Sequence, residues 1–326
     1  MMRRVLFFGT SEFAVPSLLA LLRAGYELPV VVTQPDRPAG RHLRLQPTPV
    51  RRVAEQRGLT VWTPEKVRRA EFVEQARALA PHVLVVAAFG QILPKALLEM
   101  PSSGWAINVH ASLLPKYRGA APIQHALLNG ETETGVTIMQ MEPTLDTGPI
   151  LSQRACPILP EDDAGTLEVK LAELGAELLI ETLRALEQGT VSPRPQNHSL
   201  ATYAPPITRE DGFIHWDDTA QRTWCRVRAM SPKPGAGFFW NGKWVKVWRC
   251  LPTEEHTSQP PGTVLRVERQ SLVVACGEST VLQLLEVQPE SRPRMNASDW
   301  ARGARLRNGS LLTLPHAVEG KDASAG

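Results

Sequence analysis

The chain has few of the residues that hold metal ions or disulfide frameworks. Its four cysteines are far apart in 326 residues, and no two of them form the Cys-x-x-Cys pair typical of zinc and redox sites. Its eight histidines show neither Glu-x-x-His nor His-x-x-x-His spacing. The sequence therefore predicts no bound metal, and it predicts reduced, buried thiols.

Long apolar segments are missing as well. The first residues carry two arginines and a short apolar run that ends at Gly9, which is shorter than a signal-peptide core, and no later segment could span a bilayer. We therefore predict a cytoplasmic protein without a membrane partner. Phosphate-binding motifs are also absent, because neither Gly-x-Gly-x-x-Gly after the first strand nor Gly-Lys-Ser/Thr occurs.

Charge is nearly balanced, and its small surplus lies in the C-terminal third. The net charge is +3; residues 1–205 carry 20 basic and 20 acidic side chains, and residues 206–326 carry 16 and 13. Such a surplus is compatible with RNA as a partner, but also with an ordinary solvated surface. Composition alone leaves the partner open.

Short apolar runs alternate with helical patterns in the first half of the chain. Strands are predicted at 5–9, 28–33, 59–62, 83–88 and 106–109, and helices around 18–22 and at 48–57 and 65–79. Repeated strand–helix units predict an α/β fold with a doubly wound, Rossmann-like parallel sheet and helices on both faces.

The second half begins with a different pattern. Residues 136–141 and 149–156 read as an antiparallel pair of strands with Asp146 in the loop between them, and a long helix at 166–188 completes a first domain, 1–189. A proline-rich segment, 190–206, reads as a linker. A helix at 219–230 and strands at 244–248, 262–267, 271–275 and 281–287 predict a small OB-like β-barrel, 207–315, before a disordered tail, 316–326.

Three side chains suited to acyl transfer are candidates for a catalytic site. Asn108 and His110 are two residues apart, so they lie on one side of the predicted strand 106–109 and its end, and Asp146 follows about thirty residues later. An amide can stabilise an oxyanion, an imidazole can move protons, and a carboxylate can hold the imidazole. A lone histidine is more often an ordinary core or loop residue. Ligands of doubly wound sheets, however, bind at the carboxyl ends of the strands, and this favours a functional role for His110 beside Asn108.

The chain also resembles a known family through motifs along its whole length. In the first domain these are Phe7-Phe-Gly-Thr10, Thr33-Gln-Pro-Asp-Arg-Pro-Ala-Gly-Arg41, Ala88-Phe-Gly-Gln-Ile-Leu-Pro94, Asn108-Val-His-Ala-Ser-Leu-Leu-Pro115, Arg118-Gly-Ala-Ala-Pro-Ile-Gln124 and Gly135 to Met141 with Leu145-Asp-Thr-Gly148. In the second domain they are Trp216 to Trp224, Met230 to Pro234 and Lys243 to Trp248. Together they are similar to the methionyl-tRNA formyltransferases. That resemblance implies formyl transfer from 10-formyltetrahydrofolate to the α-amino group of initiator methionyl-tRNA, at the start of translation.

The resemblance also implies roles for individual residues. The catalytic residues would be Asn108, His110 and Asp146. The folate-binding residues would be Ser112, Leu113, Leu114 and Pro115, with Phe89 and Gly90 beside the pterin. The tRNA-binding residues would be Arg41 and Arg44 in the first domain and Lys243 and Lys246 in the second.

The two regions expected to bind tRNA have plainer interpretations as well. The loop from Arg37 to Arg52 carries five arginines and no acid, and charge alone would favour a solvated loop there. Lys243 and Lys246 could likewise belong to a solvated strand face. The family resemblance favours RNA contacts in both regions. We expect the protein to act as a monomer.

Two alternative functions remain open at the level of sequence. The same chemistry could serve another amine, such as that of a nucleotide sugar or a purine precursor. The chain could instead be a non-catalytic RNA-binding protein with a relic formyltransferase domain, although the complete trio Asn108, His110 and Asp146 argues against this.

Overall fold

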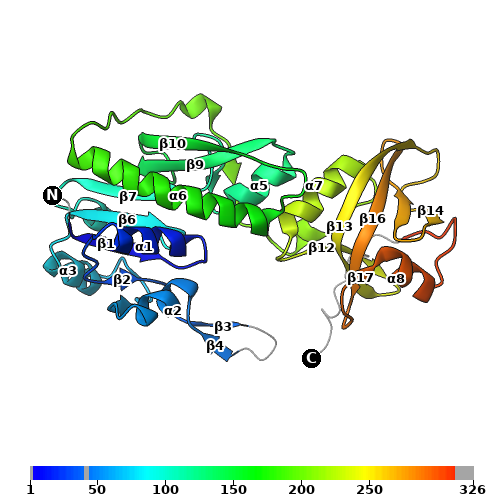
Figure 1. Cartoon of the computed structure of the whole chain (residues 1–326), viewed down its shortest axis with the longest axis horizontal. Helices are drawn as coiled ribbons and strands as arrows, with labels where there is room; N and C mark the ends of the chain where they lie inside the picture. Colours follow the sequence, from blue (N-terminus) through cyan, green and yellow to red (C-terminus); the bar gives the residue numbers. More distant parts are fainter. Residues whose placement is uncertain (1–2, 40–43, 313–326) are drawn as a thin grey trace, which may run out of the picture. The chain divides into compact units, whose positions relative to one another are not determined.

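The protein is described here by a computed structural model covering residues 3–39 and 44–312 (Figure 1). The chain divides into two compact units. Unit 1 comprises Met1–Ile123, Thr132–Leu159 and Thr166–Pro205, and unit 2 comprises Gln124–Glu131, Pro160–Gly165 and Pro206–Gly326. The segment predicted as a linker, 190–206, lies in unit 1 as far as Pro205.

Unit 1 is built on a seven-stranded sheet in the order β10-β9-β7-β6-β1-β2-β5. Five neighbouring strands are parallel; β9 pairs with β7 in the antiparallel direction, and β10 pairs antiparallel with β9. The strands are β1 (Val5–Gly9), β2 (Val31–Val32), β5 (Val61–Trp62), β6 (Val83–Ala87), β7 (Trp105–His110), β9 (Glu133–Gln140) and β10 (Ile150–Pro157). The predicted α/β class is confirmed.

Helices cover both faces of this sheet. They are α1 (Ala14–Arg23), α2 (Pro49–Gln56), α3 (Ala70–Ala78), α4 (Lys95–Leu98) and α6 (Ala164–Glu187), whereas α5 (Pro122–Leu128) belongs mainly to unit 2. A Cβ atom on Gly175 of α6 would lie 2.8 Å from Val109 of β7, so α6 packs closely on that face. The opposite face carries an aromatic cluster in which Phe8 packs edge-on against Phe89 and Phe72. Side chains of β7 that alternate with Val109 therefore point away from α6.

Local sequence explains most helix boundaries in unit 1. Thr48 caps α2, because its hydroxyl accepts a hydrogen bond from the Arg51 N–H, and Pro49 occupies the first helical position. The helix predicted at 65–79 begins only at Ala70. The Val67 N–H donates instead to the side chain of Gln91, so the chain before Ala70 is held outside the helix.

Two short ribbons complete unit 1. β3 (Arg37–Ala39) and β4 (Arg44–Gln46) pair with each other next to α2 (Figure 1). β8 (Arg118–Gly119) and β11 (Tyr203–Ala204) pair in parallel, which brings the end of the predicted linker against the loop that follows β7. A 3₁₀ turn, η1 (His198–Leu200), precedes β11.

Unit 2 is a six-stranded antiparallel sheet with two helices. Its strands are β12 (Ala236–Trp240), β13 (Lys243–His256), β14 (Val264–Val267), β15 (Leu272–Ala275), β16 (Thr280–Pro289) and β17 (Met295–Asn296), in the order β12-β13-β16-β15-β14 with β17 on β16. The 3₁₀ turn η2 (Glu210–Gly212) and α7 (Ala220–Met230) precede this sheet, and α8 (Ala297–Gly303) follows it. Trp216, Phe238 and Trp300 form edge-on contacts in its core. The predicted second domain of short antiparallel strands is confirmed.

Two expectations about composition can be compared with the described residues. None of the helices in 3–39 and 44–312 combines the length and the apolar character needed to cross a bilayer. All four cysteines are free thiols; Cys225, Cys250 and Cys276 are buried as predicted, but Cys156 is half-buried, because it lies near the end of β10 at the edge of the sheet.

Candidate active site

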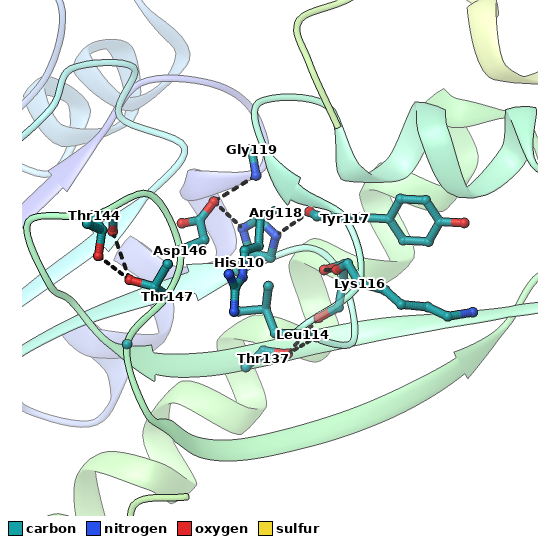
Figure 2. A network of polar contacts seen from close by, with 12 residues as sticks. His110, Leu114, Lys116, Tyr117, Arg118, Gly119, Thr137, Thr144, Asp146 and Thr147 are labelled. Atoms are coloured by element: carbon teal, nitrogen blue, oxygen red, sulfur yellow. Dashed lines mark hydrogen bonds and ion pairs between the residues drawn. The ribbon is translucent and has the colours of Figure 1, made fainter. Parts of the chain in front are cut away.

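A buried imidazole faces a carboxylate at the end of the central strands. His110 is the last residue of β7, and Asp146 lies in the loop between β9 and β10, as the sequence predicts. Nδ1 of His110 is 3.7 Å from Oδ2 of Asp146, and the two side chains are only 6% and 12% exposed. Figure 2 shows the Asp146 carboxylate pointing toward the imidazole ring. The pair can therefore hold and move a proton away from bulk water.

The hydrogen-bond partner of the other ring nitrogen, Nε2, determines which nitrogen of the neutral His110 ring carries the hydrogen. Nε2 is 2.9 Å from the carbonyl oxygen of Tyr117, and a carbonyl oxygen only accepts hydrogen bonds. Nε2 must then carry the hydrogen. In the neutral imidazole Nδ1 is the unprotonated nitrogen, and it is the one that faces Asp146. A proton taken up by this ring arrives at Nδ1, where the carboxylate stabilises the resulting cation.

The backbone holds the carboxylate in place. Oδ2 of Asp146 accepts a hydrogen bond of 2.8 Å from the N–H of Gly119. Asp146 has a φ of +50° and Tyr117 a φ of +62°, both in the left-handed region that non-glycine residues seldom adopt. Backbone strain of this kind is concentrated at functional sites.

The Asn108 amide lies on the same side of β7 as His110. Asn108 is half-buried, it pairs with Val86 of β6 and Met139 of β9, and no side chain or backbone group in 3–39 or 44–312 hydrogen-bonds its amide. The amide is therefore available to donate to a bound molecule. Asn108, His110 and Asp146 meet at one edge of the sheet, as we expected from the sequence.

The loop predicted to bind folate, residues 112–115, is held by hydrogen bonds to the buried Thr137. Thr137 of β9 donates to the Ser112 carbonyl at 2.6 Å and accepts from the Leu114 N–H at 3.1 Å. The Ser112 hydroxyl donates to the carbonyl of Lys116, so this side chain is occupied within the loop. Ser112 and Leu114 are buried, whereas Leu113 and Pro115 are half-buried and accessible to a ligand.

Phe89 and Gly90 follow β6 and reach the same sheet edge. The Phe89 side chain is buried, and its carbonyl accepts hydrogen bonds from Thr10 at 2.8 Å and Gln34 at 3.3 Å. Gly90 is exposed with a φ of +85°. A ligand beside Asn108 could contact the backbone here, because Gly90 has no side chain to cover it.

The residues predicted to bind tRNA are distributed over both units. Arg41 lies outside the described residues, and Arg44 is the first residue of β4 and pairs with Ala39. Lys243 is exposed at the start of β13. Lys246 is half-buried, and its Nζ lies 3.5 Å from the ring centroid of Trp248 and donates to the Pro232 carbonyl.

A second cation reaches the same indole ring. The Arg294 guanidinium carbon lies 3.2 Å from the Trp248 centroid, so two cations occupy opposite faces of this ring. Burial, followed by the charges of Arg294 and Lys233, lowers the pKa of Lys246 to about 8. This concentration of positive charge suits an anionic partner.

Sequence reasoning missed the groups that hold the His110–Asp146 pair. Two are backbone groups, the Tyr117 carbonyl and the Gly119 N–H, which leave no signal in a side-chain pattern. A third is Gln196, whose amide donates to the carbonyl of Asp146. The only signal for Gln196 was its place in a segment whose many prolines indicated a linker.

Fold and site together define a class of protein, an α/β enzyme for acyl-group transfer. Two sequence families match this chain: the formyl transferase family over residues 2–183, and the formyl transferase C-terminal domain family over residues 206–305. The chain is 46% identical to the methionyl-tRNA formyltransferase of Caldanaerobacter subterraneus subsp. tengcongensis, over 95% of this chain and 99% of that one. It is 46% identical to the methionyl-tRNA formyltransferase of Enterococcus faecalis, over 93% and 96%.

The chain belongs to the methionyl-tRNA formyltransferase family. This confirms the family predicted from the motifs, and it confirms that the protein is a formyltransferase enzyme. Among solved structures, an N-formyltransferase from Helicobacter canadensis in complex with folinic acid and dTDP-3-aminofucose superposes with a TM-score of 0.63 at 19% identity, over 87% of this chain and 99% of that one. At that identity the likeness concerns the fold.

Proposed function

We propose that the protein transfers the formyl group of 10-formyltetrahydrofolate to the α-amino group of initiator methionyl-tRNA. One observation carries the proposal: a chain 46% identical to named methionyl-tRNA formyltransferases over nearly its whole length has a buried His110–Asp146 pair beside an unpartnered Asn108 amide. The division of labour is the one expected from sequence, with catalysis in 1–189 and tRNA binding in 207–315.

Asn108, His110 and Asp146 carry the chemistry in this proposal. Bound 10-formyltetrahydrofolate supplies a formyl carbon, which forms a bond to the amine nitrogen and loses its bond to N10. The Asn108 amide donates to the carbonyl oxygen as negative charge develops on it, and donors of this kind are worth about 3–4 kcal/mol of barrier. Nδ1 of His110 takes the proton from the attacking amine and returns it to the leaving N10.

Asp146 makes the proton transfer by His110 favourable. While the proton resides on the ring, both nitrogens carry hydrogens, one directed at the Tyr117 carbonyl and the other toward the carboxylate. Opposite charges in a site of low exposure attract strongly. Overall the amine loses one proton and N10 gains one, so no side chain needs to form a covalent bond to the substrate.

Folate binding is assigned to two segments at the same sheet edge. Residues Ser112, Leu113, Leu114 and Pro115 form one wall, mainly through the accessible Leu113 and Pro115. Phe89 and Gly90 form the other through their backbone, because the bare, exposed Gly90 allows a flat ring to approach. This arrangement fits a pterin, which offers a planar surface and several hydrogen-bonding groups.

The tRNA contacts are assigned to basic residues in each unit. Arg41 and Arg44 belong to the arginine-rich loop of unit 1, and Lys243 and Lys246 belong to β13 of unit 2. Such residues bind phosphates, and binding then weakens as the salt concentration rises. We expect the protein to work as a monomer in the cytoplasm, where aminoacylated tRNA is found.

The test is to incubate the protein with 10-formyltetrahydrofolate and one amine at a time. We expect formyl-methionyl-tRNA from initiator methionyl-tRNA, and little product from elongator methionyl-tRNA or free methionine. Formylation of a nucleotide-linked amino sugar instead would favour the alternative acceptor, and no product from any amine would overturn the proposal. A His110→Ala variant should bind tRNA normally but transfer no formyl group.

A further inference from the structure

The loop that carries Asp146 is held by a glutamine from the segment predicted to be a linker. Gln196 is only 6% exposed. Its Nε2 donates to the backbone carbonyl of Asp146 at 2.9 Å and to that of Gly148 at 2.8 Å. Both hydrogens of the amide therefore hold the two ends of the short stretch that presents the carboxylate.

The same glutamine is oriented by a buried cation. Oε1 of Gln196 accepts from Nε and Nη2 of Arg118, at 3.1 and 2.7 Å. A guanidinium only donates and a carbonyl only accepts, so these four contacts allow a single orientation of the amide. Arg118 is 2% exposed, and its Nη2 also donates to Nδ1 of His198.

Arg118 has no carboxylate partner within 3–39 and 44–312, which is unusual for a buried cation. Its neighbour, Gly119, donates its N–H to the Asp146 carboxylate. Two consecutive residues of β8 thus hold Asp146, one at its side chain and the other through Gln196 at its backbone. Figure 2 shows the Gly119 nitrogen directed at the Asp146 carboxylate.

We propose that Gln196, oriented by Arg118, is a positioning residue that keeps the Asp146 carboxylate against His110. The φ of +50° at Asp146 makes such a restraint useful, because the left-handed conformation costs free energy even for aspartate, which adopts it more readily than most residues with a side chain. Without it the loop would relax and the carboxylate would leave Nδ1. The inference rests on the proposed function, since formyl transfer is the activity that it concerns.

The substitution Gln196→Glu distinguishes a positioning role of Gln196 from a role in packing alone. Gln196→Glu keeps the shape of the side chain and gives Arg118 a carboxylate, so the buried cation stays paired. The change replaces the donating Nε2 by an oxygen, which faces the carbonyls of Asp146 and Gly148 and repels them. Asn197→Ala is a matched control, because Asn197 is the exposed neighbour and its side chain accepts hydrogen bonds from the N–H and the hydroxyl of Ser199, away from Asp146.

The expected result is a fall in kcat with little change in binding. Displacement of a catalytic group by about 1 Å can cost roughly 100-fold in rate, so Gln196→Glu should lower kcat by about 10- to 100-fold while the KM for methionyl-tRNA changes less than about twofold. Asn197→Ala should keep the wild-type kcat. Thermal unfolding of both variants checks that they fold.

A double-mutant cycle decides whether Gln196 acts through Asp146. In an Asp146→Asn background, Gln196→Glu should lower kcat by less than about twofold, because the carboxylate is already gone. An equal loss in both backgrounds, or a wild-type kcat for Gln196→Glu, would overturn the inference. Wild-type enzyme without formyl transfer would instead contradict the proposed function itself, so the two failures are distinguishable.

Discussion

Removing the Thr137 hydroxyl should loosen the loop of residues 112–115 without changing the shape of the core. Thr137→Val replaces a hydroxyl by a methyl group at a position that is completely buried in β9. The change removes three hydrogen bonds, the donation to the Ser112 carbonyl and the acceptances from the Leu114 N–H and from Nε2 of Gln153. It leaves two backbone groups buried without these partners.

The size of this effect follows from the two orphaned groups. A buried donor or acceptor without a partner costs about 1–3 kcal/mol, so Thr137→Val should lower the free energy of unfolding by about 2–5 kcal/mol. Gln153 loses its hydrogen bond of 2.9 Å to the hydroxyl but keeps the one of 2.8 Å to the Leu114 carbonyl; because its side chain is half-buried, the freed amide hydrogen adds less to the loss than a buried backbone group does. The loss is large for a domain whose total stability is of the order of 5–15 kcal/mol.

Urea unfolding followed by circular dichroism measures the stability, and hydrogen exchange of residues 110–116 measures the loop. Thr137→Ser is the control, because it keeps the hydroxyl and removes only a methyl group, at about 1 kcal/mol. The KM for the formyl donor should rise in the valine variant more than the KM for tRNA. If valine and serine variants were equally stable, the hydroxyl would not support the loop as we argue.

Three further predictions concern other parts of the chain. Gly148→Ala would place a Cβ atom on the Gln140 carbonyl oxygen and displace the catalytic carboxylate, so kcat should fall by about 100-fold; an unchanged kcat would show that the loop adapts. Lys246 loses its charge as pH rises through about 8, and tRNA affinity should weaken there in the wild type but not in Lys246→Arg, as filter binding would reveal. Because the pKa of Lys246 in the folded state lies below the ordinary lysine value of 10.5, this lysine disfavours the folded state below pH 8, and the free energy of unfolding should increase between those two pH values. Burial raises the pKa of Cys276 to about 12, so at pH 8 iodoacetamide should label the half-buried Cys156 first and Cys276 only after denaturation; equal labelling rates would contradict this.

Sequence patterns predict where Asn108, His110 and Asp146 lie, because the placement of these three residues depends on local geometry. A strand has a period of two, so Asn108 and His110 necessarily share a side of β7, and the carboxyl ends of parallel strands meet at one edge. Asp146 was predictable from the antiparallel alternation on either side of it. These inferences need only the direction of each strand.

Other parts of the fold depend on contacts that no local pattern records. β12 was missed, because Gly235 and Gly237 interrupt its apolar pattern and only its pairing with β13 makes it a strand. The segment 190–206 has the composition of a linker, yet the Thr202 hydroxyl accepts from the Tyr117 N–H and the Thr202 carbonyl accepts from the Arg118 N–H. Proline content predicts stiffness, but not what a stiff segment packs against.

The arrangement around His110 explains why that distant segment matters for catalysis. Tyr117 presents its carbonyl to Nε2 of the imidazole, and Gly119, two residues later, presents its N–H to the Asp146 carboxylate. The segment 117–119 is held in turn by hydrogen bonds to Thr202 and by pairing with Ala204 of β11. Movement of this short segment would shift the partners of the base and of the carboxylate together. Changes at Gln196 or at the Thr202 hydroxyl should therefore alter kcat even where they leave Asn108, His110 and Asp146 untouched.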